Sequence, residues 1–193
     1  MSEDPRTDAE LVRASLEDPA AFAPIFERHH GRIFTYLARR AGSEVAGDLA
    51  GEVFLIAFRQ RDRFRDDATI VTPWLFGIAS NVARRHARSR ARRLRAWARA
   101  AVPPLTLDPD AEGRIDTARL GPALLSAIDG LRAKDREVLL LFALGDLSYP
   151  EIGEALGIPG GTVRSRLFRA RTELRNLLTE IGQQLEDDEG GSG

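Results

Sequence analysis

The sequence contains no cysteine, a single lysine and no long apolar run. Without cysteine, a disulfide framework and a thiolate metal site are both excluded. No stretch reaches the roughly eighteen apolar residues of a membrane helix. The polar start, MSEDPRTDAE, lacks the basic and then apolar layout of a signal peptide. We therefore expect a cytoplasmic protein that does not insert into a membrane.

What is present is an ordinary soluble composition with an unusual bias towards arginine. Hydrophobic residues make up 43% of the chain and charged residues 30%, and the formal net charge is −1. The total charge gives no general attraction to nucleic acid, so the positions of the charges matter more. Because 28 basic residues include only one lysine, Lys134, arginine number is weak support for any function. Only arginines on one helical face are informative.

Apolar residues recur at spacings of three and four, and alternating strand patterns are nearly absent. The sequence therefore predicts an all-α fold. The first half should form four helices: one starting near Asp8 and ending before Asp18-Pro19, one from Phe22 to near Gly42, one from about Glu44, and one beginning at Thr72-Pro73.

The fourth of these helices has a basic face opposite its apolar stripe. One side of the cylinder is predicted to carry Asn81, Arg84, Arg85, Arg88 and Arg92. Near its start, Trp74 and Phe76 could stack on bases, but we expect both in the core.

Prolines, a glycine and acidic residues interrupt the helical pattern after the fourth helix. We predict two small helical domains, residues 1–100 and 121–182, joined by a flexible linker over residues 101–120. A linker of this length could span roughly 60 Å when extended. Residues 183–193 are predicted to be a disordered acidic tail.

The second domain contains a helix-turn-helix pattern. Ser148 and Glu151 have the spacing of a capping box, and Gly157 is placed to end the short helix. Thr162 is the expected N-cap of a second helix, whose outward face is polar and basic. Such a helix can enter a DNA major groove. An amphipathic hairpin with a solvated arginine face is the alternative, and for any one arginine, phosphate contact or solvent exposure is favoured over base readout.

Two blocks in this order resemble the extracytoplasmic function (ECF) sigma factors, the minimal group of the sigma-70 family. In the first half, AFAPIFERHHGRIFTYLARR, DLAGEVFLIAFRQRDRF and PWLFGIASNVARRHARSRARR resemble region 2 of that family. In the second half, REVLLLFALGDLSYPEIGEALGIPGGTVRSRLFRARTELR resembles region 4. The resemblance implies a region 2-like helical bundle and a region 4-like helix-turn-helix domain.

The resemblance also implies three sets of functional residues. The residues implied to dock on the β′ clamp helices of core RNA polymerase are Asp48, Leu49, Glu52, Val53, Phe54 and Phe58. The melted minus-ten element is expected to meet Asn81, Arg84, Arg85, Arg88 and Arg92. The minus-thirty-five element is expected to meet Thr162, Arg164, Ser165, Arg166, Arg169 and Arg171.

The implied function is promoter-specific initiation of transcription in a bacterium. The implied partners are core RNA polymerase, through its β′ clamp helices and β flap, promoter DNA and an anti-sigma factor. No catalytic residue, metal or cofactor is expected, because separated strands need only be held better than the duplex.

Two other functions compete with this one. A stand-alone helix-turn-helix regulator would bind its operator alone, usually as a dimer, and would leave the basic face around Arg84 unexplained. A metal-dependent nuclease would depend on His29, His30 and His86. Adjacent histidines on a helix point about 100° apart, so the nuclease is the weaker alternative.

Overall fold

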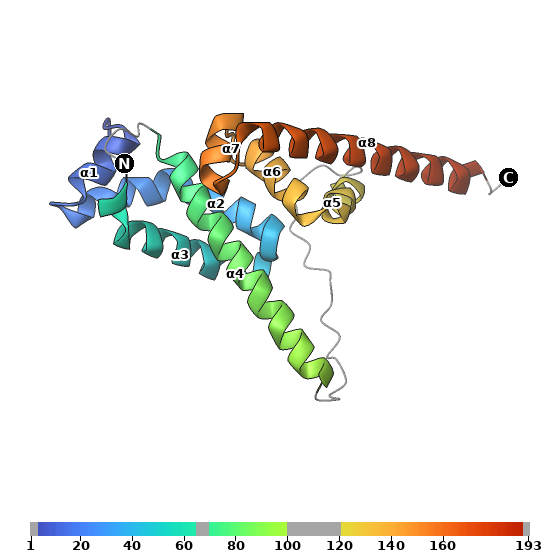
Figure 1. The fold of residues 1–193 in the computed structure, drawn as a ribbon, viewed down its shortest axis with the longest axis horizontal. Coiled ribbons are helices and arrows are strands. Elements are labelled where there is room, and N and C mark those ends of the chain that lie inside the picture. The colour runs from blue at the N-terminus through green and yellow to red at the C-terminus, as the bar shows by residue number, and fades with distance from the viewer. Residues whose placement is uncertain (1–3, 65–69, 100–120, 191–193) are drawn as a thin grey trace.

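The computed structural model describes residues 4–64, 70–99 and 121–190, without the side chains of residues 96–99, 121–123 and 180–190. The prediction of an all-α fold is confirmed, because these residues form helices and no strand (Figure 1). The first half contains α1 (Asp8–Ala14), α2 (Ala23–Ala41), α3 (Ser43–Arg59) and α4 (Thr72–Arg99), with short 3-10 helices η1 (Pro19–Phe22) and η2 (Arg61–Arg63). The second half contains α5 (Gly121–Gly130), α6 (Ala133–Ala143), α7 (Tyr149–Leu156) and α8 (Gly160–Gly190).

The N-terminal domain is a bundle of α2, α3 and α4 with α1 packed on α2. Gly42 ends α2 with a φ of 99°, which lets the chain turn at once into α3. Each helix buries one apolar stripe, as the spacing of three and four predicts. The stripes meet in a fully buried centre that includes Ile33, Leu37, Val53, Ala57, Leu75 and Ala79.

A polar contact joins α1 to α2. Asp8 accepts hydrogen bonds from Arg28 at 2.7 Å and lies 2.6 Å from the ring of His29. Partial burial raises the pKa of the Asp8 carboxyl, but the bonds from Arg28 and His29 outweigh that effect and leave this pKa below its usual value. The ionised carboxylate therefore stabilises the position of α1.

The C-terminal domain forms around the predicted helix-turn-helix. Ser148 and Glu151 make the capping box at the start of α7, and Gly157 ends α7 in the left-handed conformation with a φ of 63°. Both features were predicted. The turn places α7 across α8, where Ile152, Val163 and Leu167 are buried together with Ala170.

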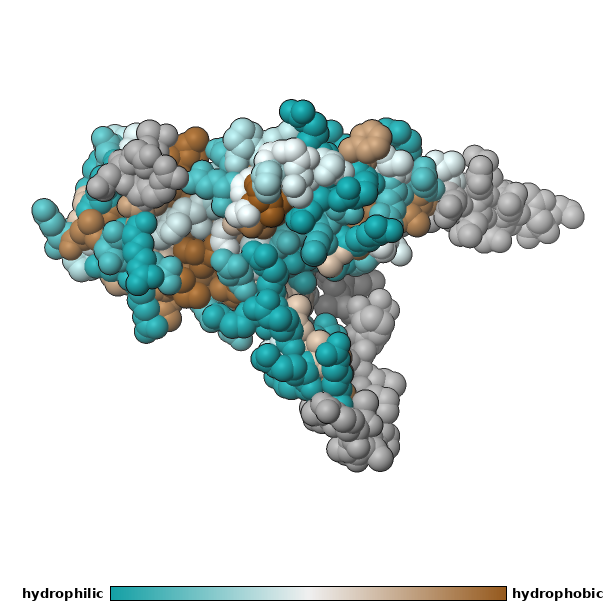
Figure 2. All heavy atoms as spheres, in the orientation of Figure 1, coloured by the Kyte–Doolittle hydropathy of each residue, from teal (hydrophilic) through white to brown (hydrophobic). Residues whose placement is uncertain are grey.

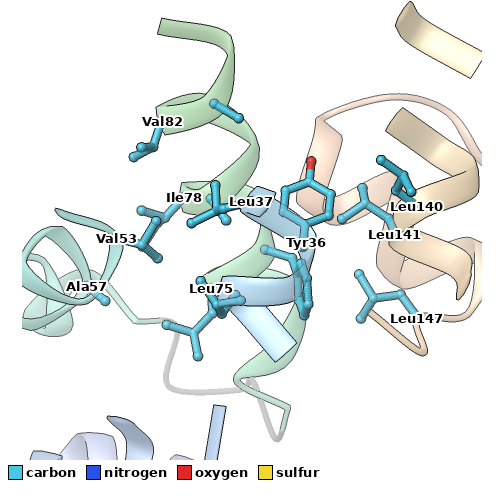
Figure 3. Packing of buried hydrophobic residues seen from close by; sticks show 14 of the residues in the cluster. Tyr36, Leu37, Val53, Ala57, Leu75, Ile78, Val82, Leu140, Leu141 and Leu147 are labelled. Atoms are coloured by element: carbon cyan, nitrogen blue, oxygen red, sulfur yellow. The ribbon is translucent and has the colours of Figure 1, made fainter. Parts of the chain in front are cut away.

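The two domains pack directly against each other, which the sequence did not indicate. Helix α7 lies along α4, and buried residues of both domains belong to one continuous core. At its centre the fully buried Tyr36 of α2 faces Leu140 and Leu141 of α6 (Figure 3). Phe76 is also buried there, 5.4 Å from Tyr36 between ring centroids. The expected core role of Phe76 is confirmed.

One expectation about a helix end was wrong. Thr162 is not an N-cap: α8 begins at Gly160, because the Pro159 carbonyl accepts the backbone N–H groups of both Thr162 and Val163. Helix α8 extends to Gly190 and so includes residues 183–190 of the predicted acidic tail. Residues 191–193 and the predicted linker lie outside the described residues. No described helix is long and apolar enough to cross a membrane.

Candidate nucleic-acid interface

The basic face predicted on α4 is on the surface, but it is partly occupied. Asn81, Arg85, Arg88 and Arg92 are exposed, and the projecting half of α4 is covered by hydrophilic side chains (Figure 2). Arg84 is half-buried and donates a hydrogen bond of 3.0 Å to the side-chain oxygen of Asn81. The face is therefore continuous, and Arg84 is its innermost member.

Two arginines of the α4 face contact carboxylates. Arg85 forms an ion pair with Glu52 of α3, which lies beside α4. The Nε atom of Arg84 lies 3.7 Å from the carboxylate of Glu137, a residue of the other domain. Arg88 and Arg92 form no ion pair with another residue of the described part of the chain. The positive charge available to a ligand therefore increases along α4, away from the core.

The face predicted on α8 divides into unpaired and paired arginines. Arg164 and Ser165 are exposed and Arg166 is half-buried, and neither arginine is ion-paired within the described ranges. Arg169 donates two hydrogen bonds, of 3.0 and 3.2 Å, to the buried Asp135 at the start of α6. This carboxylate raises the pKa of Arg169 above its usual value. Asp135 thus ties α8 to α6.

Aromatic side chains complete the α8 face. The guanidinium of Arg171 lies over the ring of Phe142, 4.9 Å from its centroid. Phe168 is 71% exposed, although it stands between the arginines of the face. Phe168 was not among the residues predicted to contact DNA, although it follows Arg164 by four residues and so shares its side of α8. A large apolar side chain held in water at the centre of a basic face is the signal that could have identified it.

The six residues predicted to dock on polymerase do not form one surface. Leu49, Val53 and Phe54 lie in the core of the N-terminal domain, 8%, 0% and 6% exposed. Phe58 is half-buried and packs edge-on against Phe22. These positions fall on the inner stripe of α3, which fills the space between α2 and α4. Asp48 is exposed and the Glu52 side chain is 41% exposed, so these two can reach a partner.

Exposed apolar side chains that the sequence did not single out form a patch on α2 and α3. Leu55 of α3 is 47% exposed, and Phe26 and Phe34 of α2 are 43% and 36% exposed. His30 stands between the two phenylalanines, with ring centroids 4.7 and 6.1 Å from theirs. Apolar side chains gather where α2 and α3 lie side by side (Figure 2). Leu55 follows Glu52 by three residues, and that helical spacing could have identified it.

Two of the three histidines of the nuclease alternative, His29 and His30, have other contacts. His29 is buried against Asp8, and His30 is stacked in the aromatic row. Among the described residues no group of three histidine, aspartate or glutamate side chains could hold a metal ion. The described part of the structure gives this alternative no support.

Comparisons with known proteins match the two halves separately. A family model described as Sigma-70 region 2 matches residues 25–93, and one described as Sigma-70, region 4 matches residues 122–174. The chain is 34% identical over 179 residues to the RNA polymerase sigma factor CarQ of Myxococcus xanthus, covering 89% of this chain and 96% of that protein. It is 29% identical over 194 residues to the ECF RNA polymerase sigma-E factor of Escherichia coli K12, covering 91% and 96%.

Solved structures show a similar fold. One is CnrH in complex with the cytosolic domain of CnrY, with a TM-score of 0.66 and 26% identity over 90% of this chain and 97% of that one. Another is the sigma factor RpoE of Bartonella quintana in complex with the anti-sigma factor NepR. Its TM-score is also 0.66, with 23% identity over 82% of this chain and 96% of that one, a likeness of fold alone.

Proposed function

Since this chain belongs to the sigma-70 family, as an ECF RNA polymerase sigma factor, we propose that it recognises both promoter elements and holds the melted strand. The observation that carries this proposal is the presence of two exposed arginine faces, one on each domain. A helix-turn-helix regulator needs only the face on α8. The second face, on α4, has a purpose only if the protein also binds a second stretch of DNA.

Recognition of the minus-thirty-five element is assigned to the first turns of α8. A major groove admits one helix, and a guanidinium can donate two hydrogen bonds to the edge of guanine. Arg164, Ser165 and Arg166 project from these turns, with Phe168 beside them to contact a thymine methyl group. Thr162 stands at the start of this set. Arg169 and Arg171 act as positioning residues, because Asp135 and Phe142 already hold them.

Binding of the melted minus-ten strand is assigned to α4. An unpaired base needs hydrogen-bonding groups, and the backbone needs cations along its path. The amide of Asn81 supplies the first, and Arg88 and Arg92 supply the second. Arg84 and Arg85 join them once they leave Glu137 and Glu52. Strand separation then requires binding energy and no catalytic side chain.

Docking on core polymerase is assigned to α3 and the adjoining edge of α2. The exposed carboxylates of Asp48 and Glu52 lie on the same helix as Leu55, and Phe26 and Phe34 are exposed on α2, which packs against it. Such a patch with a charged rim is typical of a protein interface. The β′ clamp helices are its proposed partner, and the β flap is the proposed partner of the C-terminal domain. Buried Leu49, Val53 and Phe54 shape this surface from below, with Phe58 at its edge.

Control by a separate inhibitor is also proposed. The similar structure of RpoE contains an anti-sigma factor, and both structures described above are complexes. By analogy, an anti-sigma factor covers the polymerase-docking surface of this chain in the bacterial cytoplasm. Purification of the chain from the source organism tests this, because a bound inhibitor would co-purify with it.

Reconstituted transcription tests the proposed function. We expect the chain alone to bind promoter DNA poorly and to confer promoter-specific initiation on core polymerase. Asn81→Ala should reduce initiation on duplex DNA far more than on a pre-melted template, because its contact with an unpaired base offsets the cost of strand separation, which a pre-melted template does not incur. Equal losses on both templates would contradict the role of Asn81. Tight operator binding by the chain alone as a dimer would favour the stand-alone regulator instead.

A further inference from the structure

A buried cluster of polar side chains joins the two domains. At its centre is Glu137 of α6, whose side chain is 6% exposed. Its carboxylate accepts a hydrogen bond from the Ser80 hydroxyl of α4 and lies 3.4 Å from a guanidinium nitrogen of Arg40 in α2. Arg84 approaches the same carboxylate oxygen at 3.7 Å. One acidic residue of the C-terminal domain therefore meets three polar residues of the N-terminal domain.

Close backbone contact surrounds this cluster. A Cβ atom added at Gly77 of α4 would lie 3.0 Å from the carbonyl oxygen of Ala155 in α7. The guanidinium of Arg32 donates to the carbonyl of Gly145, again between the domains. With Tyr36 packed against the leucines of α6 (Figure 3), these contacts leave no room for a nucleic-acid strand between α4 and α7.

This arrangement is incompatible with binding two separated DNA elements at once. Gly77 is about one helical turn before Asn81, and α7 leads directly into α8. Axes of packed helices are about 8–10 Å apart, whereas the proposed promoter elements are about two turns of DNA apart, each turn about 34–36 Å. The two faces can therefore reach their elements together only after α7 leaves α4. The sequence between the domains is long enough to allow this.

The cluster also withholds charge from the α4 face. A guanidinium binds a carboxylate and a phosphate through the same charge-assisted hydrogen bonds. While Glu137 is near Arg84, that arginine is not available to a DNA backbone. Closing the domains thus competes with strand binding at the inner end of α4.

We propose that Glu137 holds the free chain in a closed form that cannot bind both elements of a promoter, and that initiation requires it to leave Arg40, Ser80 and Arg84. What it says of promoter elements and of initiation rests on the proposed function, whereas the closed form held by Glu137 does not. The contact is suited to reversal, because desolvation of buried charges offsets much of their attraction. In addition, Arg40 Nε is buried without a hydrogen-bond partner among the described residues.

The distance between the domains of the free chain tests the proposal. Because the chain has no cysteine, Gly47→Cys on α3 and Lys134→Cys on α6 create two unique sites for spin labels, both exposed. We expect one narrow, short distance distribution in this labelled background. Glu137→Gln, which removes the charge but keeps the size, should broaden the distribution and move it to longer distances. Gly77→Leu should do the same by steric clash with Ala155.

Two matched variants control for charge and bulk. Asp129→Asn removes the ion pair of Asp129 with Arg136, which lies wholly within the C-terminal domain. Gly31→Leu adds the same side chain as Gly77→Leu at a position with nothing within 4 Å of its Cβ. Both should keep the short distribution. If Glu137→Gln loses helical circular dichroism, Arg40→Met takes its place. This variant removes the same ion pair through its other partner, and its distance distribution then tests the proposal.

Binding to a random-sequence duplex tests the withheld charge. Glu137→Gln should bind about fivefold or more tightly than Asp129→Asn, which carries the same net charge, in line with typical coupling between sites. A broad distribution in the labelled background, an unchanged one in folded Glu137→Gln, or equal DNA affinities of these two variants would overturn the proposal. None of these measurements involves polymerase, so they leave the proposed function to its own test.

Discussion

The two basic faces differ in how much of their charge the protein itself neutralises. On α4 the two innermost arginines, Arg84 and Arg85, contact Glu137 and Glu52, which lie on other helices. On α8 the outermost arginine, Arg164, has no ion-pair partner in the described part of the chain. In the proposed DNA complex, Arg164 of the α8 face needs no change of partner, whereas Arg84 and Arg85 of the α4 face must exchange carboxylates for phosphates. Counting arginines does not reveal this difference.

The largest expected effect concerns the α8 face. Arg164→Ala or Arg166→Ala should weaken binding of the polymerase complex to its promoter by about 1–3 kcal/mol and relax specificity at one base pair. Thermal stability should not change, because neither arginine is ion-paired within the described residues. Arg175→Ala, an exposed arginine further along α8, is the control. A loss of equal size on every sequence, with a shallower salt dependence, would reassign the residue to phosphate contact.

A methyl group added at Gly153, beneath α8, and one added at Gly51, on α3 beside α4, should change the free energy of unfolding in opposite directions. Gly153 of α7 lies under α8, and a Cβ there would meet the carbonyl oxygen of Ile158 at 2.9 Å. Gly153→Ala should therefore lower the free energy of unfolding by about 1–3 kcal/mol, despite the better helix propensity of alanine. Gly51 of α3, which has nothing within 4 Å of its Cβ, is the matched site. There Gly51→Ala should raise stability by about 0.5–1 kcal/mol.

Urea denaturation followed by circular dichroism measures both glycine variants. Stabilisation by Gly153→Ala would show that the turn between α7 and α8 relaxes without cost, and the contrast between the two glycine sites would disappear.

The smallest expected effect concerns the pair of Glu52 and Arg85. Both side chains are substantially exposed, at 41% and 54%, so the ion pair contributes only about 0.2–1 kcal/mol. Glu52→Gln should strengthen binding of a single-stranded oligonucleotide by an amount in that range, because Arg85 no longer has to leave a partner. Fluorescence anisotropy with the chain alone measures it. Glu44→Gln makes the same charge change on the same helix and should increase the affinity less. Equal gains for both variants would show that only the net charge matters.

Local signals in the sequence predicted most of the helices and the helix-turn-helix. Thr72-Pro73, Ser148 with Glu151, and Gly157 each satisfy or end a helix through groups within a few residues, so their effects can be read without tertiary structure. Reasoning from neighbouring residues also led to the wrong N-cap at Thr162. A side-chain N-cap was expected, but the backbone carbonyl of Pro159 performs that role.

Contacts between distant residues could not be predicted in this way. Glu137 occupies an ordinary position for a charged residue on a short helix, and its burial depends on α2 and α4, more than fifty residues away in sequence. Leu49 and Val53, by contrast, lie four residues apart on the apolar stripe of α3, and helical spacing alone is enough to predict that both are buried. Spacing along a helix shows which residues share a side, but it does not show which side another helix will cover.

Helix α4 carries both the interdomain contact and the proposed strand-binding face on a single rigid rod. Gly77 and Ser80 face the other domain, and Asn81 and Arg88 face solvent, so their angular offset is fixed by the helix itself. Inserting one residue after Ser80 would rotate everything beyond it by about 100°. Insertions or deletions in this helix would therefore alter domain closure and strand binding together. Substitutions, by contrast, can change domain closure or strand binding without rotating one set of residues relative to the other.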